Sequence, residues 1–282
     1  SQVNHTITPV FIASTAHLIV LTKLSMPLLA TAPLNVTEKC LLALTGAKAL
    51  HALTHQPVFS FCHKLNFEEI FNVLLQTYAD KPDEKLTAKR DKISALLNVE
   101  VKLTIQTLAK YFTDEPLAQQ RQPVLCHGDL NFGNVFYQVP SITKTNTHKS
   151  TSDSTETGID MVNPVVKLID FESLCLMPQE YEVAMMLAVN NIAFSQFETL
   201  VQTSSVSGNS SIKKMLNELD AQLVEHFYSL ALLINGIWYL TKIGNGKVND
   251  IHNSEVDDLY FAKAREQFTL YKQNTLLNLI FK

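Results

Sequence analysis

Apolar residues recur every three or four positions over most of the chain, and short runs of β-branched residues interrupt this pattern in a few places. Recurrence at that spacing predicts helices, because such residues share one helix face. Before residue 123 the pattern predicts a buried strand at 17–24 and a linker with two prolines at 26–35. It then predicts three helices, at 37–54, 67–78 and 85–112. Thr37 is the predicted N-cap of the first helix. After Pro178 it predicts three further helices: 180–197, 212–240 and 256–271 onward.

The stretch 123–172 is typical of strands instead. The segments NVFYQV (134–139) and VVKLIDFE (165–172) are rich in β-branched and aromatic residues, so we expect them to pair as a hairpin. A tract rich in Ser and Thr, at about 140–164, joins them. Such a tract buries little apolar surface, so it is predicted to be a flexible insertion. A regulatory segment is the alternative interpretation.

Hydropathy and charge restrict the class of protein. Residues 183–194 are apolar almost all round, which predicts a helix inside the larger lobe. The run 227–240 contains Asn235 and Gly236, so we interpret it as a buried helix and expect no membrane span. With 23 Lys and Arg against 27 Asp and Glu, the net charge is −4. This balance disfavours nucleic acid and membrane surfaces as partners.

The cysteines and the first ten residues bear on the compartment. Cys40, Cys62, Cys126 and Cys175 are far apart and form no CxxC pair, so no metal or redox motif is indicated. They are expected to be reduced, buried thiols of a cytoplasmic protein. The first ten residues lack the positive flank of a signal peptide.

The segment 127–134, HGDLNFGN, carries the candidate chemistry. It places Asp129 and Asn134 five positions apart on a predicted loop, and Asp170 follows a hydrophobic strand further along. Phosphoryl transfer needs a carboxylate that orients the acceptor hydroxyl, and an amide and a second carboxylate that hold Mg²⁺. These oxygen ligands suit magnesium, which binds few protein groups and keeps several waters.

The spacing H-x-D-x-x-x-x-N, followed by a hydrophobic strand and Asp-Phe, is typical of protein-kinase-like enzymes. The sequence here resembles the aminoglycoside phosphotransferase and choline kinase family, and is nearest to small choline kinase and thiamine kinase-like proteins. HGDLNFGNVFY resembles the catalytic motif and KLIDFE the metal motif. The likeness extends over about 17–240 and includes ALHALTHQPVFSF (49–61) and LINGIWYL (233–240).

This resemblance implies an α+β, protein-kinase-like fold made mainly of the helical C-lobe with a catalytic β-hairpin. Residues 1–30 would form a remnant of the N-lobe with the hinge strand, and 31–282 the C-lobe. The implied function is an enzyme, an ATP-dependent phosphotransferase that phosphorylates a hydroxyl of a small metabolite of the choline, ethanolamine, thiamine or aminosugar type. Its cofactors would be ATP and Mg²⁺.

The resemblance also implies roles for the residues that match its motifs. Asp129 would be the catalytic base, and Asn134 and Asp170 would bind Mg²⁺. Glu172 would reach a second metal or a bridging water, the alternative being a plain surface acid. His127 would support the loop as a hydrogen-bonding residue instead of carrying a proton.

Further roles concern the nucleotide and the acceptor. The backbone of the hinge would pair with adenine, and its residues are Thr22, Lys23, Leu24 and Ser25. Trp238 and Tyr239 would form an aromatic wall for a cationic substrate, the alternative being core packing. His51 is interpreted as a helix-packing residue. Glu182 stands where the family commonly has Asp, and is expected to make a supporting hydrogen bond.

The expected N-lobe is largely missing from this pattern. The first glycine is Gly46, so no glycine-rich loop precedes the hinge. Lys23 is rejected as the phosphate-binding strand lysine, because the Leu-His helix follows it too closely. A start point inside a longer chain and evolutionary loss of the N-lobe are both open explanations. A catalytically impaired, kinase-like binding protein is therefore the alternative function, and self-association through an exposed apolar face is expected.

Overall fold

The structure is a computed structural model that describes residues 8, 11–14, 19–21, 23–80, 87–138, 164–204, 210–243 and 252–271. The helices in this part of the chain are α1 Val36–His51, α2 Phe67–Ala79, α3 Thr87–Asp114, α4 Pro116–Gln119, α5 Gln179–Val189, α6 Gln196–Ser204, α7 Ser210–Asn217, α8 Ala221–Lys242 and α9 His252–Leu270. The strands form three antiparallel pairs: β1 Phe11–Ser14 with β2 Ile19–Leu21, β3 Val124–Cys126 with β6 Cys175–Met177, and β4 Val135–Gln138 with β5 Val165–Leu168.

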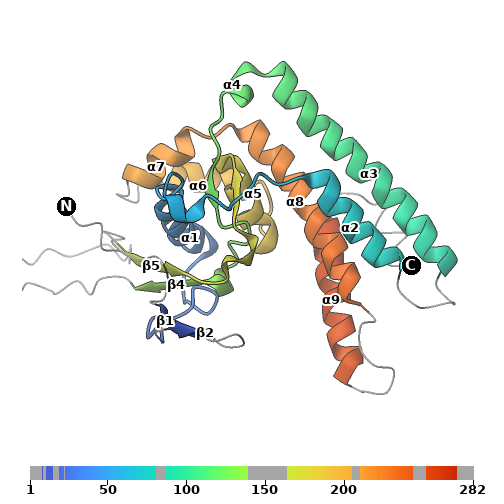
Figure 1. Cartoon of the computed structure of the whole chain (residues 1–282), viewed down its shortest axis with the longest axis horizontal. Coiled ribbons are helices and arrows are strands. Elements are labelled where there is room, and N and C mark those ends of the chain that lie inside the picture. The colour runs from blue at the N-terminus through green and yellow to red at the C-terminus, as the bar shows by residue number, and fades with distance from the viewer. Residues whose placement is uncertain are drawn as a thin grey trace, which may run out of the picture.

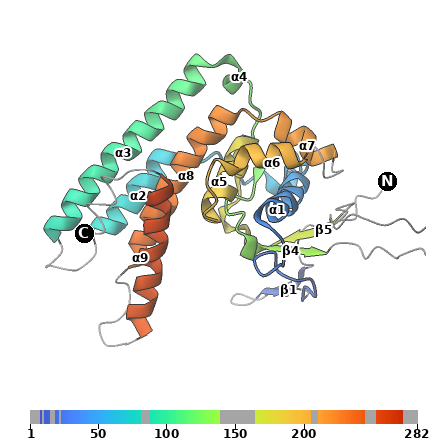
Figure 2. The ribbon, with the colours of Figure 1, turned by 180° about the vertical axis from the view of Figure 1, so that it is seen from behind.

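Helices α5 and α8 lie at the centre of the molecule and pack against each other. On one side α8 contacts α2, α3 and α9, which form an arm of long helices; on the other lie α1, α6, α7 and the strand pairs (Figures 1 and 2). Every residue from Glu180 to Ala188 is buried. This confirms the buried helix predicted over 183–194 as far as Ala188, because a helix enclosed by neighbours needs apolar residues on all sides. The end of the predicted segment was wrong, since α5 stops at Val189 and both Asn191 and Ala193 are exposed.

The predicted hairpin is present as β4 and β5. Val135 pairs with Leu168 and Gln138 with Val165. One step beyond this register, the Ile169 amide donates to the Asn134 carbonyl over 3.0 Å. The hairpin therefore carries Asn134 and Asp170, which belong to two distant motifs, to the same end of one strand pair.

Several predicted helix boundaries were wrong. The predicted helix 180–197 is two helices, since α5 ends at Val189 and Asn191 adopts a φ of +55° before α6 begins. The predicted helix 212–240 is also two, because the Asp220 side chain caps a new start by accepting from the Gln222 and Leu223 amides. Apolar periodicity continues across both breaks, so it does not reveal them.

The first helix begins one residue before its predicted cap. Asn35, not Thr37, is the N-cap of α1, and it forms a reciprocal capping box with Glu38. Strand β6 was not predicted, because three residues are too short for alternation to be recognised. The predicted strand 17–24 is present as β2 over Ile19–Leu21, and residues 17, 18 and 22 lie outside the described part.

Two predictions concern segments that the structure describes little or not at all. The Ser- and Thr-rich tract 140–164 lies outside the described residues except for Pro164. The division into an N-lobe remnant at 1–30 and a C-lobe at 31–282 stays a prediction.

Helix α8 is long and apolar enough to cross a membrane by length and composition, and most of its apolar window is buried against the other helices.

Candidate functional site

The HGDLNFGN segment leaves the sheet at the end of β3 and reaches β4 through a short 3-10 turn, Phe132–Asn134. Its anchors are the side chains of His127 and Leu130, which are fully buried. Apolar contact at Leu130 and hydrogen bonds at His127 hold the intervening chain on the core. Asp129, between them, is only partly buried.

Both ring nitrogens of His127 are used to hold backbone. Nε2 lies 2.8 Å from the Ile169 carbonyl oxygen, and Nδ1 lies 3.3 Å from the Asp129 amide nitrogen. A carbonyl accepts and an amide donates, so the ring that satisfies both is the neutral tautomer with its proton on Nε2. This geometry joins the two motifs and leaves no ring nitrogen for proton transfer.

The loop is also held from below by α5. The buried Glu182 carboxylate accepts from the His127 amide at 2.5 Å and from the Gly128 amide at 3.4 Å. At the end of α5, Asn190 accepts from the Phe132 amide and donates to the Leu130 carbonyl. One helix therefore supports the loop at both ends, and Glu182 makes the supporting hydrogen bonds expected of it.

Gly128 is required by backbone geometry. Its φ is +76°, and a Cβ built there would lie 2.3 Å from the Ser173 carbonyl oxygen. Only glycine adopts this conformation freely and lets two backbones approach so closely. The contact brings the loop against the Phe171–Ser173 turn that follows Asp170.

Asp129 and Asn134 are directly bonded. The Asn134 side-chain amide donates to the Asp129 carboxylate at 3.1 Å and to the Asp129 carbonyl at 3.0 Å. Burial is the largest influence and raises the pKa of the Asp129 carboxyl; the nearby His127 ring and the Asn134 hydrogen bond oppose this rise, and the charges of Asp170 and Glu172 add to it. These residues therefore share one electrostatic environment. Asn134 Nδ2 makes both bonds, and within the described part of the chain its Oδ1 atom accepts no hydrogen bond.

Asp170 has an unusual backbone. Its φ of +65° and ψ of +63° lie in the left-handed region, which Asp tolerates better than most residues. Such conformations persist where the surroundings impose them, and they concentrate at functional sites. Asp170 and Glu172 are both exposed, so their carboxylates are accessible to solvent.

The predicted hinge is only partly described. Thr22 lies outside the described residues, while Lys23, Leu24 and Ser25 are irregular chain. The next segment pairs with β4, since the Leu29 amide donates to the Val135 carbonyl and the Ala30 amide to the Phe132 carbonyl. The predicted hinge segment therefore leads directly onto the strand that follows Asn134.

The predicted aromatic pair belongs to a larger cluster. Trp238 and Tyr239 of α8 both lie near Tyr260 of α9, with ring centroids 6.3 Å apart in each case. Trp238 is 41% exposed, so it is not a core residue. Burial raises the pKa of Tyr239, and the Asp129 carboxylate adds to this, which places the phenol within electrostatic reach of Asp129.

Lysines already occupy the faces of this cluster. The Lys242 ammonium lies 4.5 Å from the Trp238 ring centroid, and the Lys263 ammonium lies 5.4 Å from that of Tyr239. Both distances are within the range of cation–π attraction. These rings therefore attract cations in the folded chain.

Sequence reasoning missed Asn190 and Tyr260. Asn190 follows a buried helix, and nothing at that position distinguishes a loop-supporting amide from an ordinary helix end. Tyr260 is 21 residues after Tyr239 in a separate helix. Helical spacing relates residues within one helix only, so the sequence carries no signal for this contact.

Comparison with known proteins bears on the fold. No protein-family model and no curated protein sequence matches the chain. Solved structures do match. The structure of the Plasmodium vivax ethanolamine kinase matches with a TM-score of 0.60 and 12% sequence identity, over 97% of this chain and 69% of the kinase chain. The structure of choline kinase from Cryptosporidium parvum matches with a TM-score of 0.53 and 12% sequence identity, over 98% of this chain and 78% of the choline kinase chain.

A spectinomycin phosphotransferase in complex with ADP and spectinomycin (0.55, 15%) matches over 96% of this chain and 79% of that one. The chain therefore has the protein-kinase-like fold of choline kinases, ethanolamine kinases and this antibiotic phosphotransferase, as the sequence resemblance predicted. At such identities the likeness establishes the fold.

Proposed function

We propose that this protein is an ATP-dependent phosphotransferase that acts on a hydroxyl of a small metabolite. One observation carries the proposal: Asp129 is hydrogen-bonded to Asn134 within the electrostatic reach of Asp170, on a chain with the fold of small-molecule kinases. Two motifs separated by more than thirty residues supply the base and the metal ligands that phosphoryl transfer requires.

The residues present suit Mg²⁺. The Asn134 amide oxygen and the Asp170 carboxylate would hold it, and Glu172 is the candidate ligand for a second ion. Both primary ligands are hard oxygens at the same end of the β4–β5 hairpin, which fits the preference of magnesium for few protein ligands and several waters. When bound, Mg²⁺ neutralises charge on the transferring phosphates.

Asp129 accepts the proton of the acceptor hydroxyl. The hydroxyl oxygen then forms a bond to the γ-phosphorus of ATP while the bond from that phosphorus to the bridging oxygen breaks, and ADP leaves. Partial burial brings the pKa of Asp129 closer to working pH, which makes its carboxylate a better base. The Asn134 bond fixes the direction in which the carboxylate points.

The acceptor is inferred to be a cationic or polar alcohol. The cluster of Trp238, Tyr239 and Tyr260 offers aromatic faces, and a cationic acceptor would displace the ammonium groups of Lys242 and Lys263 from the two that they contact. The carboxylates of Asp129 and Glu266 both act on Tyr239. Acceptors of the choline, ethanolamine, thiamine and aminosugar type combine a positive charge with a hydroxyl and match this surface.

A phosphotransfer assay tests the proposal. The full chain with Mg-ATP is given each of these four acceptor types, and formation of the phosphorylated product is measured. We expect turnover of at least one, and a fall of about 10²- to 10⁴-fold for Asp129→Asn. Asp91→Asn, an exposed change on α3, is the matched control and keeps the rate. Equal rates for the chain and Asp129→Asn contradict the assignment of the base.

The alternative is a protein that binds nucleotide or metabolite without transferring phosphate. One observation favours this alternative. The two described strands ahead of α1, β1 and β2, carry no lysine that could contact the phosphates of ATP. Calorimetry separates the two: binding of Mg-ATP without product formation supports the alternative, and binding with product formation contradicts it.

A further inference from the structure

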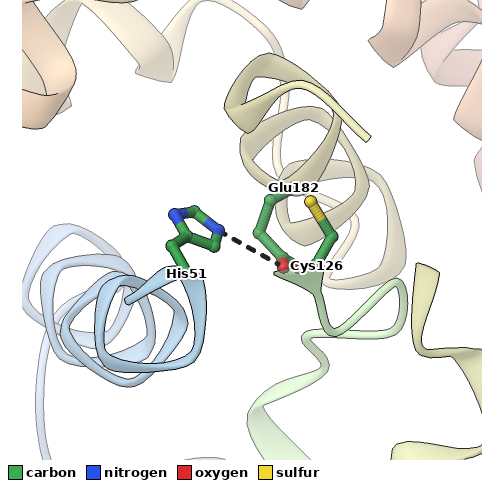
Figure 3. A group of neighbouring side chains, drawn as sticks. All are labelled: His51, Cys126 and Glu182. Carbon is green, nitrogen blue, oxygen red and sulfur yellow. Dashed lines mark ion pairs between the residues drawn. The ribbon is translucent and has the colours of Figure 1, made fainter. Parts of the chain in front are cut away.

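A second cluster of metal-ligating side chains lies behind the catalytic loop. His51 ends α1, Cys126 ends β3 and Glu182 belongs to α5, so three separate elements converge on one point (Figure 3). One ligand atom from each, a ring nitrogen, the thiol sulfur and a carboxylate oxygen, lies within 4.8 Å of the other two. The proposed phosphotransfer uses none of the three as a reacting group.

The histidine of this cluster lacks the hydrogen bond that its burial requires. The His51 side chain is 8% exposed, and its Nε2 atom is buried without a hydrogen-bond partner. The Glu182 carboxylate oxygen faces it at 3.8 Å, which is beyond hydrogen-bond distance. A buried, unpaired polar atom is destabilising by about 1–3 kcal/mol, and a bound cation would give this nitrogen a partner.

The three donors are those of a zinc site. Zn²⁺ binds imidazole nitrogen, thiolate sulfur and carboxylate oxygen at about 2.0–2.3 Å, usually with tetrahedral geometry. Ligand atoms around one such ion are about 3–4 Å apart, so small side-chain rotations bring the present separations into range. Cys175 is the cross-strand partner of Cys126 and offers a fourth donor on the same face of this strand pair. Magnesium prefers oxygen ligands and is not suited to this set.

We propose that His51, Cys126 and Glu182 bind Zn²⁺ or a divalent ion of similar softness, and that this ion competes with the catalytic loop for the Glu182 carboxylate. The same carboxylate accepts from the His127 and Gly128 amides. A metal on Glu182 weakens those two bonds and loosens the loop that presents Asp129. On binding, the metal replaces the proton of the Cys126 thiol, and that proton passes to the buffer. The effect on catalysis rests on the proposed phosphotransfer; the binding itself does not.

Cobalt spectroscopy tests the binding. Co²⁺ is added to the reduced, metal-free full chain in excess Mg²⁺. We expect a thiolate-to-cobalt charge-transfer band that saturates at one equivalent and is displaced by Zn²⁺. The band is lost in Cys126→Ser and retained in Cys40→Ser, whose cysteine is also buried and lies within α1. A band of equal strength in Cys126→Ser overturns the site.

A second measurement needs no variant, so it stands if a substitution prevents folding. X-ray absorption at the zinc edge of the wild-type chain reports the atoms bound to Zn²⁺. A first shell with one or two sulfurs besides nitrogen and oxygen supports the site. A shell of nitrogen and oxygen alone overturns it, since the Asn134 and Asp170 site contains no sulfur.

The catalytic consequence is measured separately. Phosphotransfer by the wild-type chain at fixed Mg²⁺ should fall at least about 10-fold when one equivalent of Zn²⁺ is added, the loss expected from disturbing supporting contacts. The rate of Cys126→Ser, compared with its own zinc-free rate, should not change. If zinc binds through sulfur but the phosphotransfer rate of the wild-type chain does not change, the proposed competition for the Glu182 carboxylate is overturned. A chain without phosphotransfer contradicts the proposed function and leaves the spectroscopic result to stand.

Discussion

Asp129 is a partly buried acid among other acids. Burial, together with the charges of Asp170 and Glu172, raises the pKa of its carboxyl above the ordinary value. The contribution of this carboxyl to the stability of the fold is therefore fully present below the pKa that it has in the unfolded chain. It is lost as the pH rises through the higher pKa that it has in the folded chain. At neutral pH the ionised side chain opposes folding, and the same strain makes it a stronger base.

We therefore expect Asp129→Asn to stabilise the metal-free fold at neutral pH while it removes turnover. Asparagine keeps the shape but not the charge that Asp170 and Glu172 repel. Thermal unfolding should give a higher Tm than wild type at neutral pH, with the difference disappearing in acid, where Asp129 is protonated in both states. Asp91→Asn should leave the Tm unchanged. A variant that melts below the wild type at neutral pH contradicts this account.

Two glycines of the same loop make a matched pair. Gly128→Ala should destabilise the fold by at least about 1–3 kcal/mol, because alanine is strained at positive φ and its Cβ meets the Ser173 carbonyl at 2.3 Å. Gly133→Ala should have a much smaller effect, since its Cβ meets only the Asn131 side-chain oxygen at 3.1 Å. Urea denaturation compares the two, and equal losses rule out the backbone argument.

At the scale of elements, the start of α8 depends on one carboxylate. Asp220 accepts from the Gln222 amide at 2.9 Å and from the Leu223 amide at 3.2 Å, and the Tyr111 hydroxyl donates to its other oxygen. Burial alone would raise the pKa of Asp220, but these hydrogen bonds outweigh it and the pKa is lowered. The stabilisation is therefore present above the unfolded pKa and is lost as the pH falls through the folded pKa.

Asp220→Ala should lower the free energy of unfolding by about 0.5–2 kcal/mol at neutral pH, the usual loss for an N-cap. The difference from wild type should shrink in acid, because the wild-type carboxylate is then protonated. Chemical denaturation at both pH values measures this. Asp220→Asn keeps a capping oxygen and should retain most of the stability; a loss as large as that of alanine contradicts the capping role.

At the scale of the whole molecule, α8 connects the parts. It packs on α5, which supports the HGDLNFGN loop, and on α9, which completes the aromatic cluster (Figure 1). The α8–α9 contact is close at Gly236, where a Cβ would lie 2.7 Å from the Phe268 ring. Phe268 is fully buried, so its ring has little room to move.

Gly236→Val should therefore separate α9 from α8 and lower the free energy of unfolding by roughly 1–3 kcal/mol, as overpacking does. The double variant Gly236→Val with Phe268→Leu should recover part of this loss, since the smaller side chain makes room. A double-mutant cycle measured by denaturation provides the coupling. Strict additivity of the two single changes contradicts the proposed clash.

The local pattern was sufficient for elements whose signal lies within a few residues. The β4–β5 hairpin followed from two runs of β-branched residues, and the burial of α5 from a segment apolar on all sides. The breaks at Asn191 and Asp220 did not follow, because a cap acts through one side chain and a backbone turn while the apolar spacing continues beyond them. Strand β6 was too short to show a period.

The chemical motifs could be predicted because their spacing is written along the chain: Asp129 and Asn134 are five residues apart, and Asp170 follows a hydrophobic strand. The contacts that give these residues their surroundings join segments distant in sequence, such as His127 with Ile169, Gly128 with Ser173, and Tyr239 with Tyr260. The sequence alone determines which chemical groups are present and which residues are their near neighbours along the chain. Packing brings separate elements together, and only this packing determines burial, the pKa shifts and the meeting of His51, Cys126 and Glu182.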